Sequence, residues 1–386
     1  MSAKVRPLLY NLTLTLLAVG ITLAMLEMVL RYTHLFGARV AWTVPDPVVG
    51  YAFQPGASYW SRLEADHPIT GHINQYGWRD REWSLAKPAG ETRVAVLGDS
   101  FVEAMQVEQD STFLTLAGAE LSQALGHRVE LMNFGRSGYT QSEEYLVAER
   151  DVLQFNPDVV ALFFFPGNDI ADINRQTAAH GQRPFFSMSR EGRLALDTSF
   201  ASTRTYRIRA GLAGLKRHSV LVSFLTELYV GAALKLDQPV STGLDGYLTL
   251  CTAHPDSIYA RNYALNRRMM EEMHRLLAPR GTALIIVVLP LPAYMPIENR
   301  RYMELDSTFD HLWYDKDLSK FAIANGMAFL GLERPFAEAY TRSGAPLNWS
   351  DRGHWTYAAH HVVARALSES LLPLIQQAER GPGAHP

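Results

Sequence analysis

The stretch RVAVLGDSFVEAMQV, Arg93–Val107, raises the first question about this chain. Its apolar run, Val94–Leu97, predicts a short buried strand, which Gly98, Asp99 and Ser100 end abruptly. Ser100 is either a nucleophile or only a polar residue at the end of a strand. Serines are common after strands, so the choice between these readings depends on partners elsewhere in the sequence.

Strand and helix patterns alternate from Arg93 almost to the end of the chain. Strands are predicted at 94–97, 129–133, 159–165, 283–289 and 327–330, and helices at 111–125, 142–155, 257–277, 308–325 and 355–377. The run VVALFFF, Val159–Phe165, is apolar on both faces, which is typical of a parallel sheet covered by helices on each side. The alternation therefore predicts an α/β fold with a doubly wound parallel sheet.

Composition narrows the possible functions. The chain has 386 residues, 47% of them hydrophobic, which is sufficient for a sizeable core. A net charge of -3 does not favour nucleic acid as a partner. The single cysteine, Cys251, cannot form an intrachain disulfide, and no Cys/His cluster has the spacing of a zinc site. We expect neither a metal nor a cofactor.

The N-terminus contains an apolar segment, Leu8–Leu30, which exceeds the roughly 20 residues needed to cross a bilayer as a helix. A cleaved signal peptide is the alternative, although its apolar region is usually about 7–15 residues long. Lys4 and Arg6 favour a cytoplasmic N-terminus. We therefore expect a single-pass inner-membrane anchor with the remaining chain in the periplasm. Glu27 pairs with Arg31 at the membrane edge or contacts a membrane partner.

The rest of the chain divides into four segments. Residues 32–92 are rich in proline, glycine and aromatic residues, and predict an irregular, strand-poor connector that packs on the next domain. Residues 93–377 form the predicted catalytic domain. Residues 170–255 interrupt its alternation of strands and helices and predict a helical insertion. The tail, 378–386, is predicted to be disordered.

Polar residues with the right chemistry follow the predicted strands. Ser100 follows the first strand, Gly138 the second and Asn168 the third, and the segment WSDRGHW, Trp349–Trp355, precedes the last helix. Because ligands of doubly wound sheets bind at the carboxyl ends of the strands, we expect these residues to meet at one edge. Catalytic and oxyanion roles can then be assigned.

The candidate roles are those of nucleophilic catalysis. Ser100 needs a base, and the neutral imidazole of His354 can take its proton. Asp351, three residues earlier, can orient that imidazole. The Ser100 and Gly138 amides and the Asn168 side chain can stabilise a developing oxyanion.

Each residue also has a structural alternative. Gly138 can permit a tight turn, Asn168 can cap a helix, and Asp351 can be the N-cap of the last helix. His360 and His361 are rival bases, although neither has a carboxylate three or four residues away.

Four sequence blocks carry a resemblance to a known family. GDSF at Gly98–Phe101, Gly138, GND at Gly167–Asp169 and DRGH at Asp351–His354 resemble the blocks of the SGNH, or GDSL, hydrolases. The resemblance implies a flavodoxin-like three-layer sandwich. It also implies Ser100, His354 and Asp351 as the triad, with Ser100, Gly138 and Asn168 as the oxyanion hole, and it favours Gly138 over Gly135. Phe101 stands where many members have leucine.

The connector is similar to segments of membrane-anchored bacterial SGNH proteins, some of which act on O-acyl groups of exported polysaccharides beside membrane acyltransferases. The resemblance implies a serine esterase or O-acyltransferase, acting on acyl or acetyl esters of envelope glycans. Two alternatives stay open: an anchored assembly subunit of a membrane complex, and a lipase or phospholipase. The side chains of Trp313, Tyr314, Trp349 and Trp355 can stack on sugars or pack in the core.

Overall fold

A computed structural model describes residues 5–33, 43–61, 64–226, 228, 244–349 and 353–380 of the chain. Its centre is a parallel sheet of five strands in the order β11-β10-β7-β5-β6. The strands are β5 (Thr92–Gly98), β6 (Val129–Gly135), β7 (Val159–Phe164), β10 (Ala283–Val288) and β11 (Ala328–Gly331). Counted along the chain, this is the flavodoxin-like order 2-1-3-4-5, which confirms the predicted fold class.

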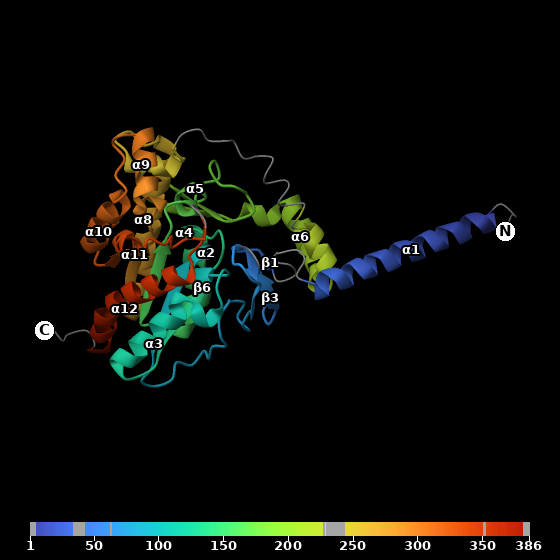
Figure 1. Cartoon of the computed structure of the whole chain (residues 1–386), viewed down its shortest axis with the longest axis horizontal. Coiled ribbons are helices and arrows are strands. Elements are labelled where there is room, and N and C mark those ends of the chain that lie inside the picture. Colours follow the sequence, from blue (N-terminus) through green and yellow to red (C-terminus); the bar gives the residue numbers. More distant parts are fainter. Residues whose placement is uncertain are drawn as a thin grey trace.

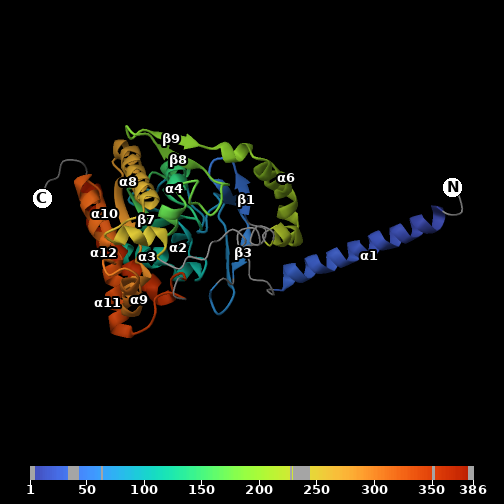
Figure 2. The same cartoon turned by 90° about the horizontal axis from the view of Figure 1, so that it is seen from above.

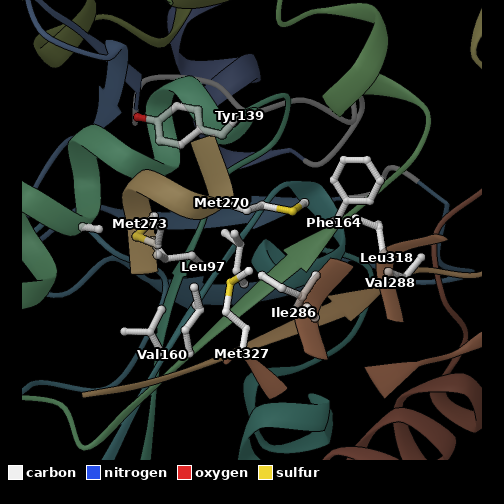
Figure 3. Close-up of a cluster of buried hydrophobic side chains, with 14 of the residues drawn as sticks. Leu97, Tyr139, Val160, Phe164, Met270, Met273, Ile286, Val288, Leu318 and Met327 are labelled. Atoms are coloured by element: carbon white, nitrogen blue, oxygen red, sulfur yellow. The ribbon is translucent and has the colours of Figure 1, made fainter. Parts of the chain in front are cut away.

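Helices cover both faces of the sheet, as expected for strands that are apolar on both sides (Figure 1). One face packs against α3 (Phe113–Leu125), α11 (Glu333–Ser343) and α12 (Tyr357–Arg380). The other packs against α4 (Gln141–Val147), α8 (Ser257–Leu277) and α10 (Trp313–Ala324). Figure 3 shows this second layer, where Met270 and Met273 of α8 meet Leu97, Val160 and Ile286 of the strands.

Most predicted elements occur close to their expected positions, with differences at helix ends. The helix predicted at 142–155 is regular only through α4 and continues as a π-helical turn, Ala148–Val152, and a 3₁₀ turn, Leu153–Phe155. Helix α12 runs to Arg380, so the first three residues of the predicted disordered tail are helical, and 381–386 lie outside the described residues. The structure adds α9 (Pro296–Leu305) and α11, which the sequence patterns did not predict.

The connector contains more regular structure than expected. It forms two antiparallel hairpins, β1 (Thr43–Asp46) with β2 (Gly50–Phe53) and β3 (Ser58–Ser61) with β4 (Ile69–His72). The prediction of a strand-poor segment was wrong because strands of four residues are too short to produce a clear alternating pattern. Trp78 and Trp83 are buried against Phe134 of β6, so this segment contributes to the core.

The insertion includes a hairpin as well as helices. Strands β8 (Phe185–Met188) and β9 (Leu194–Asp197) pair antiparallel, and α6 (Arg204–His218) and a helical segment at 220–226 follow. The N-terminal helix α1 (Val5–Tyr32) projects away from the sheet and its helices (Figures 1 and 2). By length and apolar composition, its residues Leu9–Tyr32 suffice to cross a membrane.

Candidate active site

Ser100 lies at the turn between β5 and the short helix α2 (Ser100–Glu103). The buried Asp99 side chain accepts a hydrogen bond from the Phe101 amide at 3.0 Å and caps this helix. Burial is the main cause that raises the pKa of Asp99, to about 6. A Cβ on Gly98 would lie 2.4 Å from Val102 Cγ2, so the turn requires glycine there. The residues around Ser100 therefore hold the turn in shape.

His354 lies directly beside Ser100, although 254 residues separate them in sequence. Its Nε2 is 2.8 Å from the Ser100 Oγ, a geometry in which the hydroxyl can donate to the imidazole. The imidazole ring packs against the Phe101 ring at a centroid distance of 4.9 Å. The structure thus brings together the two residues that the sequence proposed as nucleophile and base.

The carboxylate on the far side of His354 belongs to Glu64, between β3 and β4. Its Oε1 is 2.7 Å from His354 Nδ1, and its Oε2 accepts the His354 backbone N–H at 2.7 Å. Partial burial acts to raise the pKa of Glu64, but its hydrogen bonds and attraction to His354 outweigh burial and lower it. Asp351, the carboxylate expected in this position, lies outside the described residues.

Sequence reasoning missed Glu64 because the connector carries no motif around it. The one available signal was the aromatic content of the connector, which indicated that the segment packs on the catalytic domain. Buried acids in such a segment are candidates for the site, but the sequence does not reveal which of them reaches His354.

After β6, the backbone amide of Gly138 is available to a ligand, whereas the amide of Gly135 is not. The Gly135 amide donates to Asn133 Oδ1 at 2.9 Å, and a Cβ there would lie 2.5 Å from the Glu103 nitrogen. Gly138 adopts φ +73°, a conformation that glycine tolerates readily. In the described part of the chain its amide has no hydrogen-bond partner. The structure thus leaves the Gly138 N–H available.

Asn168 is positioned by the same loop. It begins the short helix α5 (Asn168–Ala171), and its Nδ2 donates to the Tyr139 carbonyl at 2.8 Å. An amide nitrogen carries two hydrogens, so one remains for a ligand. The Ser100 amide, in the first turn of α2, likewise has no acceptor among the described residues. The loops after β5 and β6 are joined by the Arg136 amide, which donates to the Gly98 carbonyl at 3.0 Å.

A buried polar layer supports the Asn168 loop. Asp169 accepts hydrogen bonds from the Phe165 amide at 2.6 Å and from Gln141 Nε2 at 3.1 Å. Burial raises the pKa of Asp169 well above its ordinary value, and so favours the protonated form. Asn266 of α8 donates to the Asp169 carbonyl at 3.0 Å, which ties the loop to the helical layer.

His360, a rival base in the sequence, has a structural role. It is buried, its Nδ1 accepts the Phe113 amide at 3.2 Å, and its ring stacks on the Phe113 ring. Burial lowers the pKa of His360 to about 3, so it stays neutral. It connects α12 to α3 through this hydrogen bond and the ring contact.

One cavity borders the candidate site, and a second cavity shares a turn of the chain with it. The smaller has a volume of about 50 Å³ and is lined by apolar and small residues, including Phe101, Phe165, Tyr247, Leu291 and Gly353. Phe101 and Gly353 are the chain neighbours of Ser100 and His354. The larger, an open groove of about 430 Å³, is lined by Leu250, Tyr263, Arg267, Trp313 and Asp317 among others. One 3₁₀ turn, Gly246–Cys251, contributes to both.

No protein-family model and no curated protein matches the sequence. Among solved structures, the chain is similar to TesA, with 13% identity, a TM-score of 0.39 and coverage of 73% of this chain and 99% of that one. It is similar to the acetyl xylan esterase AlAXEase, with 16% identity, a TM-score of 0.42 and coverage of 72% and 99%.

The chain is also similar to a mutant of Axe2, an acetylxylan esterase from Geobacillus stearothermophilus, with 14% identity, a TM-score of 0.39 and coverage of 74% and 95%. At these values the likeness does not identify the chain. The candidate active site rests instead on the arrangement of Ser100, His354 and Glu64 described above.

Proposed function

We propose that the chain is a membrane-anchored ester hydrolase or O-acyltransferase of the SGNH type, with Ser100 as its nucleophile. The observation that carries the proposal is the continuous hydrogen-bonded series from Ser100 Oγ through His354 to Glu64, at 2.8 and 2.7 Å. A serine hydroxyl is a weak nucleophile until a neighbouring base accepts its proton, and this series supplies the base and its orienting carboxylate.

The proposed reaction has two acyl-transfer steps. His354 Nε2 takes the Ser100 proton as Oγ attacks the ester carbonyl, and the imidazolium then protonates the leaving alcohol. Glu64 holds the Nδ1–H tautomer and stabilises the positive ring. The amides of Ser100 and Gly138 and the Asn168 side chain donate to the oxyanion. Water, or a sugar hydroxyl in a transferase, then attacks the acyl-enzyme with His354 as base.

The size of the small cavity supports a short acyl group. At about 50 Å³ it has space for only a few water-sized groups, since one water needs roughly 10–15 Å³ on the same scale. An acetyl group is of this size, whereas a long acyl chain would have to remain in solvent. This favours acetyl esters over the lipase alternative.

The open groove supports a glycan as the group that carries the ester. The half-buried Trp313 offers aromatic surface, and Arg267 and Asp317, which pair with each other at 3.3 Å, offer charged hydrogen-bonding groups. The turn Gly246–Cys251 borders both cavities, and in the proposed complex the glycan extends from the small cavity past this turn to the groove. Trp313→Ala is therefore expected to raise KM for an acetylated oligosaccharide. It should leave kcat/KM for nitrophenyl acetate within about twofold. The small ester does not reach the groove, so only the oligosaccharide loses binding energy when Trp313 is removed.

Contacts between α1 and the folded domain support a retained anchor in preference to a cleaved signal peptide. Glu27 accepts hydrogen bonds from Ser219 Oγ at 2.9 Å and from the Val220 and Leu221 amides at 3.0 and 2.8 Å. Cleavage after the apolar segment would remove this cap. The orientation proposed for the anchor places the N-terminus in the cytoplasm and the hydrolase domain in the periplasm of the inner membrane.

The test uses the full chain in detergent micelles with nitrophenyl acetate and nitrophenyl decanoate as substrates. We expect kcat/KM to be at least about 100-fold higher for acetate, and Ser100→Ala to reduce it by at least about 1000-fold. Activity that survives Ser100→Ala would refute the nucleophile assignment. A preference for decanoate would support the lipase alternative, and no turnover of any ester or acyl acceptor would support the assembly subunit. A C-terminal reporter active only in the cytoplasm would refute the proposed orientation.

A further inference from the structure

Helix α6 in the insertion exposes a continuous apolar stripe. Ile208, Leu212 and Leu215 are spaced i, i+4 and i+7 and therefore lie on one side of the helix, with exposed fractions of 51%, 37% and 59%. Leu225, in the following helical segment, is 52% exposed. Isolated exposed leucines are ordinary, but an aligned series on one helix, followed by a further exposed leucine in the next helical segment, indicates a surface that contacts an apolar partner.

The same helix is strongly basic. Its fifteen residues include five arginines and lysines and no acidic residue: Arg204, Arg207, Arg209, Lys216 and Arg217. At 100° per residue, Arg209 and Lys216 lie along one side of the apolar stripe and Arg207 along the other. An apolar stripe bordered by cations is typical of helices that lie in the plane of an anionic lipid surface.

The helix is fixed to the membrane-facing end of the molecule. Arg31 of α1 donates to the His218 carbonyl, the last residue of α6, at 3.0 Å. Glu27 accepts from the first residues of the next helical segment, as described above. In both views α6 lies between α1 and the hydrolase domain and runs across the direction of α1 (Figures 1 and 2). A membrane crossed by α1 would therefore pass close beside α6.

We propose that α6 and the segment 220–226 form a lipid-binding surface that takes the anionic headgroups and upper acyl chains of the bilayer crossed by α1. The inference rests on the proposed membrane anchor but not on the catalytic mechanism. Continuity with α1, and the cations that border the apolar stripe on both sides with no acidic residue in the helix, identify lipid as the occupant. The surface would hold the hydrolase domain in a fixed orientation, with the side that carries α6 against the membrane.

The test measures how deeply single positions enter the bilayer in the full-length protein. Leu212→Cys carries an environment-sensitive fluorophore, and Ile323→Cys on α10, 71% exposed, is the matched control. The native Cys251 is buried and should not react in the folded protein. The labelled proteins are reconstituted into phosphatidylcholine vesicles with or without phosphatidylglycerol, and quenching by brominated lipids and by aqueous iodide is compared.

We expect brominated lipid to quench the probe at 212 and not the probe at 323, with iodide showing the reverse. Removing phosphatidylglycerol, or introducing Arg207→Gln with Arg209→Gln on the two borders of the stripe, should reduce lipid quenching at 212 by at least about fivefold, since each basic residue near an anionic surface contributes roughly that factor. A probe at 212 that is as accessible to iodide as the one at 323 in both lipids would overturn the proposal.

A third labelled position separates this inference from the anchor itself. Leu17→Cys lies on an exposed face of α1. If its probe is not quenched by lipid, the proposed anchor fails. If it is quenched while the probe at 212 is not, the anchor stands and the lipid-binding surface fails. Protection at 212 in native membranes but not in pure lipid vesicles would assign the surface to a membrane protein and overturn the proposal.

Discussion

Glu64 accepts two hydrogen bonds from His354, one from the ring and one from the backbone. This pair fixes both the tautomer and the position of the imidazole, because the ring cannot rotate without breaking the Nδ1 contact. The arrangement assigns the orienting role to a residue in the connector, far from the DRGH block in which the sequence places Asp351. The distinction can be tested directly by comparing the two carboxylates.

Glu64→Gln is expected to lower kcat by about 100-fold to 10,000-fold for nitrophenyl acetate, because a neutral amide cannot stabilise the imidazolium or enforce the productive tautomer. Asp351→Asn should change kcat by less than about tenfold, since the single Nδ1–H is already donated to Glu64. Steady-state kinetics of both variants, with circular dichroism to confirm folding, provides the measurement. A larger loss in Asp351→Asn than in Glu64→Gln would restore the original assignment.

At the scale of elements, packing shifts the pKa of a side chain in a way that the sequence does not indicate. Asp315 on α10 approaches Gly331 at the end of β11, and burial raises the pKa of its carboxyl to about 7. An acid with a raised pKa holds its proton in the native state up to higher pH than in the unfolded chain. The native state therefore loses stability as pH rises from the ordinary value of 3.8 towards 7.

Asp315→Asn removes this loss while keeping the shape of the side chain. We expect the variant to be more stable than the wild type by about 1–3 kcal/mol at pH 8, because the shift of about three pKa units sets an upper limit near 4 kcal/mol. The difference should shrink towards zero below pH 4. Urea unfolding of both proteins at several pH values tests this, and a difference that does not change with pH would contradict it.

The junction between α1 and the insertion is a second element whose stability depends on one side chain. Replacing a capping carboxylate by alanine usually costs about 0.5–2 kcal/mol. Glu27→Ala should therefore speed amide exchange of residues 219–226 in the micelle-bound full chain by about 2–30-fold, while exchange in the central sheet stays unchanged. Glu27→Gln keeps an acceptor oxygen, so its exchange rate at residues 219–226 should lie between those of the wild type and Glu27→Ala. Unchanged exchange at 219–226 in Glu27→Ala would contradict the proposed cap.

At the scale of the whole molecule, α1, the connector and the insertion depend on one another. The connector supplies Glu64 to the site, and the buried Arg79 of the connector donates to the carbonyls of Glu103 and Val107 at 3.0 and 2.6 Å. The insertion supplies α6, whose last residue, His218, accepts a hydrogen bond from Arg31 of α1. Removing one of these segments should therefore change the contacts or exposure of the others, although they lie far apart in the sequence.

A truncated protein that begins at Thr43 retains Glu64 and should retain ester hydrolysis. It loses α1, and with it the proposed membrane that would cover the apolar stripe, so we expect it to self-associate through the exposed side of α6. Light scattering should show concentration-dependent oligomers, and Leu212→Ser combined with Leu215→Ser should return the protein to a monomer. If the truncated protein is monomeric without these substitutions, α6 does not mediate self-association in water.

Sequence periodicity predicted the five parallel strands and their helices because each strand is apolar on both faces and each major helix has a clear apolar side. It missed α11 and the connector hairpins, whose short patterns are ambiguous. It placed Ser100, Gly138 and Asn168 at the carboxyl ends of strands because parallel topology requires those ends to meet. Helix α8 had the expected bounds, Ser257–Leu277, since strong periodicity continues to its ends.

The sequence by itself therefore determined the sheet, the edge at which the candidate residues meet, and the pairing of Ser100 with His354 as a testable idea. Only the tertiary structure decided that Glu64 contacts His354, that Gly135 is closed to a ligand, and that Glu27 caps a segment nearly 200 residues away. The physical reason is that periodicity reports which face of an element is buried. Contacts between loops depend on how whole elements pack, and no local pattern records them.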